Sequence, residues 1–177
     1  MDRKALYNHV SDRDSLLALV ALDAFAAQFA AGDIARTSTW QDACTAYAHS
    51  FVRGIVAAGD LADHLWFDEA LTSWFLEPTE LLFSRLTDAG FHDELSIRAV
   101  TMLSTICLGH ARDITRASAS GDRPRHRSLV RALAPRDAAR YPNLVRISER
   151  GDNTYGTQQL DFTLRVFHDG VAAELDT

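Results

Sequence analysis

Apolar residues recur along this chain with the spacing of amphipathic helices from near its start to its end. Leu, Ala, Val and Phe return every three or four positions, with Arg and Asp between them. Alternation of apolar and polar residues, the pattern of a half-buried strand, never extends beyond a few residues. The pattern therefore predicts an all-α fold.

Capping residues and glycines indicate where the helices begin and end. Ser11 is suited to cap a long helix over 12–30, which Gly32 would end. Thr37, Ser38 and Thr39 all offer caps for a helix over 40–58, which Gly59 would end. Proline favours the first turn of a helix, so we place Pro78 there. Further helices are expected over 3–9, 61–67, 70–75, 78–90, 93–117, 129–133, 135–140 and 157–175, with loops over 118–127 and 148–155.

The last expected helix, 157–175, has two apolar stripes on opposite sides. One stripe consists of Leu160, Leu164, Phe167, His168, Val171 and Leu175, and the other of Phe162, Val166 and Ala173. A surface helix needs one such stripe, so two imply packing on both sides. Helix 93–117 has a similarly broad apolar face. Such helices lie either at the centre of a helical domain or between the core and a partner subunit, and the second case would make Phe162, Val166 and Ala173 a dimer interface.

The composition is that of an ordinary acidic globular domain. The chain has 177 residues, 47% of them hydrophobic and 24% charged, and its formal net charge is −6. This length suits one domain. An acidic chain cannot contact nucleic acid with its whole surface, so any DNA contact must come from a local basic patch. The arginine-rich stretch 118–127 is such a patch, although charges of this kind are more often simply solvated.

Cysteine content and the longest apolar run indicate a cytoplasmic protein. Cys44 and Cys107 are too few for a disulfide scaffold and predict free thiols in a reducing compartment. The apolar run 16–31 is shorter than the ~20 residues that a membrane span requires. The first residues lack the pattern of a signal peptide, so we expect no membrane contact.

Motifs of known enzyme classes do not occur in the sequence. A GxSxG elbow, an HExxH helix, a glycine-rich phosphate loop and a CxxC pair are all missing, so we expect neither an enzyme nor a bound cofactor. Asp60, His64 and Asp68 recur at four-residue intervals and could offer ligands to a divalent ion. A hydrated helix face is the favoured interpretation, and we predict no metal site.

Six aromatic side chains gather within 26 residues around Pro78. Large rings on short, broken helices suit the wall of an apolar cavity, although each single ring would equally suit ordinary core. His110 lies on an otherwise apolar helix face and could supply a polar contact, as could His64. We predict a mostly apolar effector pocket lined by His64, Trp66, Phe67, Trp74, Phe75, Phe83, Met102, Ile106 and His110.

The N-terminal segment 3–17 contains Leu6, Tyr7, His9, Val10, Arg13, Leu16 and Leu17 in a specific spacing. This pattern resembles one stretch of the TetR (tetracycline repressor) family. In that family the DNA-recognition helix ends in a pattern like L-Y-x-H-[VF]-x-x-[KR]-x-x-L-L and runs into a long helix. The residues named above fill its signature positions. The resemblance implies DNA contacts, with hydroxyl, imidazole and guanidinium donors facing phosphate oxygens. The residues concerned are Arg3, Lys4, Ala5, Tyr7, Asn8, His9 and Arg13.

The remainder of the chain is similar, more loosely, to the regulatory domain of the same family. An L-x-x-[AG]-G-F break over 86–91, a long helix containing Gly109 and a last helix reaching Asp169-Gly170 match the usual layout. The resemblance implies a remnant of the DNA-binding head with its connecting helix over 1–30, and an effector-binding and dimerisation domain over 31–177. It further implies a homodimeric repressor that binds operator DNA and releases it when a small apolar effector binds.

The chain begins inside the segment that resembles the recognition helix. The first two helices of the family's DNA-binding head therefore have no counterpart in it, and we expect no selective operator binding by this chain alone. Two other functions remain open at this point. One is a stand-alone helical small-molecule-binding protein derived from a repressor, and the other is a helical binder or enzyme without any role on DNA.

Overall fold

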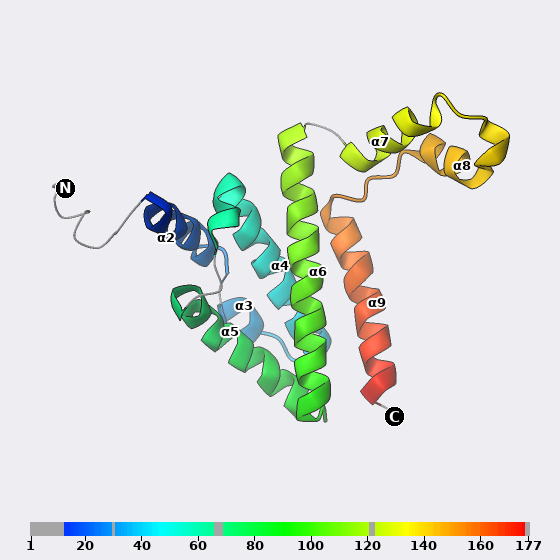
Figure 1. Cartoon of the computed structure of the whole chain (residues 1–177). Coiled ribbons are helices and arrows are strands. Elements are labelled where there is room, and N and C mark those ends of the chain that lie inside the picture. Colours follow the sequence, from blue (N-terminus) through cyan, green and yellow to red (C-terminus); the bar gives the residue numbers. More distant parts are fainter. Residues whose placement is uncertain (1–12, 30, 66–68, 121–122, 176–177) are drawn as a thin grey trace.

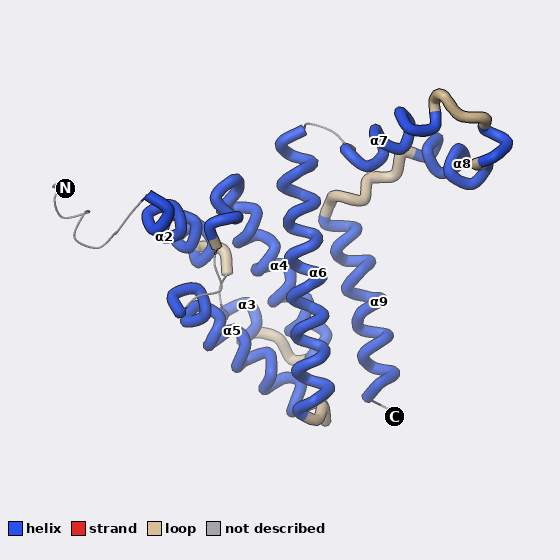
Figure 2. Tube along the Cα trace, viewed as in Figure 1, coloured by secondary structure: helices blue, strands red, loops and turns tan. Residues whose placement is uncertain are grey.

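The fold was determined as a computed structural model, which describes residues 13–29, 31–65, 69–120 and 123–175. Every regular element in these ranges is helical, so the predicted all-α class is confirmed (Figure 2). The elements in chain order are α2 (Arg13–Ala26), α3 (Ala31–Ala35), α4 (Trp40–Ala58), η1 (Gly59–His64), α5 (Glu69–Asp88), α6 (Asp93–Ser120), α7 (Pro124–Leu133), η2 (Ala138–Arg140), α8 (Pro142–Arg150) and α9 (Thr157–Leu175).

Helix α4 is the central element, and its ends lie where the sequence predicts them. The hydroxyl of Thr39 accepts a hydrogen bond from the backbone N–H of Asp42 at 3.1 Å, which satisfies one of the free donors of the first turn. Gly59 ends the helix with a φ of 57°, a left-handed conformation that favours glycine. Between these ends α4 packs against α2, α3, α5, α6 and α9 (Figure 1).

The core surrounds α4 on most of its sides. Residues that are less than 3% exposed come from several helices and include Phe25, Ile34, Tyr47, Phe51, Leu82, Leu86, Leu103, Leu160 and Leu164. Each fully buried side chain of this size contributes about 1.5–3 kcal/mol relative to its exposed state. The helices around α4 therefore derive their stability mainly from packing on it, because burial of an apolar face contributes more to a helix in a protein than its intrinsic propensity does.

Helix α5 corrects the prediction that Pro78 begins a helix. The structure has one continuous helix from Glu69 to Asp88, with Pro78 in its interior. An internal proline costs roughly 3 kcal/mol, because it removes a hydrogen bond and its ring crowds the preceding turn. Phe75, Leu82 and Leu86 nevertheless form one face that packs into the core on both sides of the proline. This packing offsets the cost.

The predicted helix 12–30 is also shorter in the structure. Helix α2 ends at Ala26, and the chain turns into the short helix α3, with Gly32 inside α3 rather than at a helix end. The turn places Ile34 in the core, where it is fully buried. By length and hydropathy alone, the stretch Arg13–Ala35 is apolar enough to cross a membrane, and 18% of its apolar window is buried in the structure. A core helix of a globular protein passes the same test of length and hydropathy.

The segment between α6 and α9 differs most from the prediction. Helix α6 continues to Ser120 and α7 begins at Pro124, so most of the expected loop 118–127 is helical. The sequence pattern did not predict α8, which has only nine residues, buries none of them and packs mainly against α7. Pro142 at its first turn and Gly151 at its end, with a φ of 62°, are the local signals that identify it. Helices α7 and α8 project from the end of the bundle (Figure 1).

Candidate functional site

A cluster of phenylalanine rings lies where α2, α4 and α5 meet. The ring of Phe75 on α5 lies 4.9–5.5 Å, between centroids, from those of Phe25, Phe29 and Phe51. Phe25 also meets Phe51 edge to face, with 5.7 Å between centroids. These separations and tilts are favourable for aromatic pairs. The cluster therefore connects helix α2 directly to the centre of the bundle.

A small cavity of about 110 Å³, open to solvent on one side, lies beside this cluster. Its wall is mostly apolar, because five elements contribute apolar side chains to it. Asp63 of η1 and Arg112 of α6 supply the charged groups of the lining, and both residues are exposed. Their charged ends therefore border the side that is open to solvent. The remaining lining residues are Phe25, Phe51, Ile55, Ala62, Leu65, Phe75 and Leu108.

The predicted pocket residues are not brought together in this one cavity. Phe75 lines it, and His64 lies between two lining residues in the sequence of η1. Trp66 and Phe67 lie outside the residues for which side chains are described. Trp74 and Met102 are 51% and 53% exposed and Phe83 is half-buried, and none of these three residues lines the cavity. Ile106 and His110 line a second cavity instead.

A second, more open cavity of about 390 Å³ lies along α6 and α9. It is lined mainly by polar side chains, and Ile106, Gly109 and His110 belong to its wall together with Thr105, Asp113, Arg125, Thr154, Gln159 and Thr163. His110 is 8% exposed, and its Nε2 atom has no hydrogen-bond partner among the described residues. Burial lowers the pKa of His110, so the neutral imidazole is the favoured form.

Arg125 joins the base of the projecting helices to this second cavity. Its guanidinium forms an ion pair with Asp113 of α6 and lies 4.9 Å from the centroid of the Tyr155 ring. The backbone N–H of Arg125 donates to the Tyr155 hydroxyl at 2.8 Å. Aromatic stacking and ion pairing together hold this junction in one arrangement.

The outer faces of α6 and α9 expose large apolar side chains. Phe162 and Val166 on α9 are 52% and 56% exposed, and Ile97 and Met102 on α6 are 58% and 53% exposed. Ala173 is exposed as well. On the opposite side of α9, Leu160, Leu164, Phe167 and Val171 are buried. Of the two apolar stripes expected on this helix, one is buried in the core and the other is exposed. His168 is half-buried, and its ring contacts that of Trp40.

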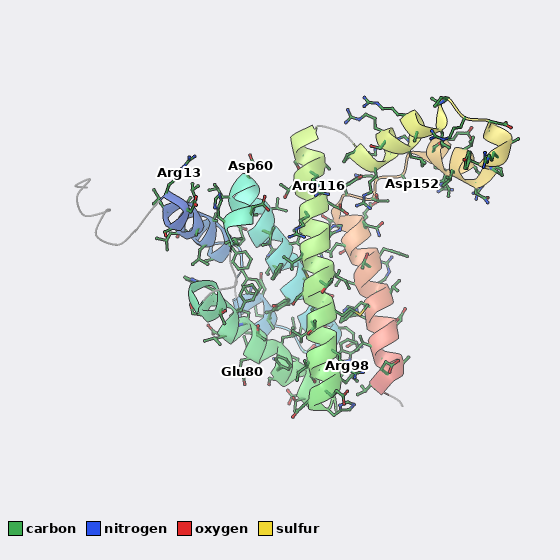
Figure 3. The ribbon with its side chains drawn as sticks, viewed as in Figure 1. Arg13, Asp60, Glu80, Arg98, Arg116 and Asp152 are labelled. Carbon is green, nitrogen blue, oxygen red and sulfur yellow. The ribbon has the colours of Figure 1, made fainter. Side chains whose placement is uncertain are left out.

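The predicted DNA contacts lie almost entirely outside the described residues. This holds for Arg3, Lys4, Ala5, Tyr7, Asn8 and His9. Arg13 is the exposed first residue of α2 (Figure 3). Among the described residues, no group of three or more His, Cys, Asp or Glu side chains could hold a metal ion.

Comparison with known protein families shows which family this helical bundle belongs to. The family model described as the tetracyclin repressor-like C-terminal domain matches residues 35–175, which is most of the chain. The chain belongs to this family. The loose resemblance of the helices after residue 30 is therefore confirmed as a family relationship, and the chain carries the C-terminal domain of a TetR-like regulator.

Two solved structures of TetR-like proteins have the same fold. A possible TetR family transcriptional regulator from Streptomyces coelicolor A3(2) has a TM-score of 0.78 and 23% identity, and the match covers 98% of this chain and 84% of that one. The Streptomyces coelicolor TetR family protein ActR, solved in complex with actinorhodin, has a TM-score of 0.69 and 21% identity, with 100% and 84% covered. No curated protein matches the chain.

Proposed function

We propose that the chain is the effector-binding and dimerising part of a TetR-like transcriptional repressor. The observation that carries this proposal is the small apolar cavity beside the phenylalanine cluster, because helix α2 contributes Phe25 to its wall. A ligand in this cavity would contact the helix that begins at Arg13, next to the segment resembling a recognition helix. Ligand binding and DNA binding would then share one structural element.

The size and lining of the cavity indicate the kind of effector. An apolar cavity of roughly 150 Å³ holds benzene, so about 110 Å³ suits a compact apolar group close to the size of one aromatic ring. A larger molecule would extend past Asp63 and Arg112, where a polar part would remain in contact with water. ActR, which shares the fold, was solved with actinorhodin bound, and this supports ligand binding by such a bundle.

The effector would act through the position of α2. Phe25 lines the cavity and contacts the rings of Phe29, Phe51 and Phe75, so a ligand that needs more room than the cavity offers would displace Phe25 and α2 with it. A ligand shifts a conformational equilibrium only by its difference in affinity for the two states. The effector must therefore bind better to the arrangement of α2 that is incompatible with operator binding.

Dimerisation would use the exposed apolar faces of α6 and α9. Burying Phe162 and Val166 contributes on the order of 1.5–3 kcal/mol for each side chain. In a twofold interface each residue is contributed by both protomers. Burial of these two residues with Ile97 and Met102 would therefore contribute several kcal/mol, which offsets part of the free-energy cost of association. This arrangement would also cover apolar surface that is otherwise exposed to water.

Filling the cavity tests the effector site. Ala62 of η1 lines the cavity, and Ala62→Leu would occupy much of its volume. Ala57→Leu on the exposed side of α4 is the matched control, because it adds the same atoms outside the cavity. Phenol, as a soluble one-ring probe, should raise the melting temperature of the parent chain and of Ala57→Leu but not of Ala62→Leu. Equal shifts in all three proteins, or none in the parent, would contradict the proposal.

A further inference from the structure

The segment 123–150, which comprises α7, η2 and α8, is a basic helical hairpin on an acidic chain. It contains eight of the chain's 18 Lys and Arg residues but only two of its 24 Asp and Glu residues, Asp137 and Glu149. The chain as a whole has a net charge of −6. Positive charge is therefore concentrated in this basic hairpin, while the rest of the chain is strongly acidic.

The basic hairpin stands away from the core but is firmly attached to it. None of the residues of α7, η2 and α8 is buried, and α7 and α8 pack mainly against each other. At its base, Arg125 pairs with Asp113 and donates to the Tyr155 hydroxyl, and His126 Nε2 lies 2.7 Å from the carbonyl oxygen of Ser148. The basic hairpin thus presents its charges on a preorganised surface rather than on a flexible loop.

Arginines on the basic hairpin are arranged in rows. Arg127 and Arg131 are four residues apart on one side of α7, about 6 Å apart along its axis, and Arg123 occupies the N-cap position of the same helix. Arg146 and Arg150 are spaced in the same way on α8, where Arg150 also pairs with Asp152 at 2.8 Å. Guanidinium groups bind phosphate through paired, charge-assisted hydrogen bonds, so rows of this kind suit a phosphate backbone.

The basic hairpin and Arg13 of α2 lie at the same end of the bundle, on opposite sides of α4 and α6 (Figure 3). Figure 3 shows Arg13, which begins α2, at the same end of α6 as Arg116 and Asp152. We propose that the basic hairpin is a second DNA-contacting surface, which binds the phosphate backbone without reading its sequence. It would contact a separate stretch of the duplex and add charge-dependent affinity. This inference needs neither the effector cavity nor the dimer.

Neutralising exposed arginines tests the inference on the full chain. The hairpin variant carries Arg131→Gln, Arg136→Gln and Arg146→Gln, and the matched control carries Arg36→Gln, Arg53→Gln and Arg98→Gln on the body. Both variants change the net charge equally. Binding to a fluorescent duplex of arbitrary sequence is measured by anisotropy over a range of salt concentrations. Three lost phosphate contacts should lower the slope of log K against log salt by roughly 0.9 each.

We expect the parent chain and the control variant to bind the duplex at low salt, and the hairpin variant to lose most of this affinity. Circular dichroism checks that both variants stay folded. Failure of the parent to bind the duplex, or equal binding by the two variants, would overturn the inference. So would binding of the parent to phosphatidylserine vesicles but not to DNA, or loss of the dimer in the hairpin variant with DNA binding unchanged.

Discussion

Gly54 of α4 lies directly against the ring of Phe25 of α2. A Cβ atom added at Gly54 would be 2.6 Å from Cδ2 of Phe25, 2.8 Å from Cε2 and 3.1 Å from the Phe25 carbonyl oxygen. Glycine inside a helix costs about 1 kcal/mol relative to alanine, so its presence here requires a reason. The reason is the close approach of α2, which places Phe25 in the cavity wall.

Substitution of this glycine should therefore destabilise the domain. Gly54→Ala gains helix propensity, but the contact with Phe25 includes a backbone oxygen that cannot rotate away. We expect a lower melting temperature and weaker phenol binding, because α2 is pushed outward. Gly109→Ala on α6 is the control, since no atom lies within 4 Å of its added Cβ, and it should stabilise the helix by up to about 1 kcal/mol. A Gly54→Ala protein as stable as Gly109→Ala would contradict this account.

Charge on the exposed face of α9 should dissociate the proposed dimer. Val166→Glu places two like charges in a twofold interface and removes an apolar side chain on each side, and Phe162→Glu should act in the same way. Light scattering should show a dimer for the parent and a monomer or an aggregate for these variants. Leu76→Glu on α5, where Leu76 is 65% exposed, is the control and should remain dimeric. A monomeric parent at micromolar concentration would refute the interface.

Stability should fall as the pH drops through the range in which histidine titrates. Burial lowers the pKa of both His110 and His168 below the ordinary 6.5, so the unfolded chain binds more protons than the folded one in this range. Stability is then complete above about pH 6.5 and declines toward the lowered folded pKa. Neither Nε2 atom has a hydrogen-bond partner among the described residues that could stabilise an added proton.

Chemical unfolding at several pH values measures this effect. Between about pH 5.5 and 7.5 the parent should lose stability on acidification, while the double variant His110→Gln, His168→Gln should show a smaller slope. His64→Gln is a suitable control, because His64 is a half-buried histidine at the end of η1, away from α6 and α9 in the sequence. A double variant with the slope of the parent would show that other groups cause the pH dependence.

Both cysteines should be unreactive in the folded protein. Cys44 and Cys107 are 1% and 0% exposed, and burial raises the pKa of each thiol to about 12. The thiolate is the reactive form, so it is scarce at neutral pH, and a reagent cannot reach it. A thiol-specific chromogenic reagent should modify neither cysteine quickly under native conditions and both after denaturation in guanidinium. Fast native modification of either one would mean that the α4–α6 packing opens readily.

Local sequence signals were sufficient for those helices whose predicted ends and apolar faces agree with the structure. Thr39 and Gly59 mark α4 correctly, and the two stripes of 157–175 correctly separate the buried Leu160 and Leu164 from the exposed Phe162 and Val166. Caps and periodicity act within a few residues, so they can be recognised without knowledge of the fold. The motif at 3–17 likewise indicated the family, which the match over 35–175 confirms.

Only the tertiary structure decided which rings meet around the cavity. Phe25, Phe51 and Phe75 come from three helices, and the sequence pattern singled out only Phe75 as a pocket residue. Spacing along the chain places a residue on a face of its own helix, but the cavity depends on which faces the other helices turn toward it. Pro78 shows the same limit, because its local preference for a first turn was outweighed by the packing of α5 on both sides of it. Contacts between distant segments arise from burial of the whole bundle, and no single stretch of sequence contains them.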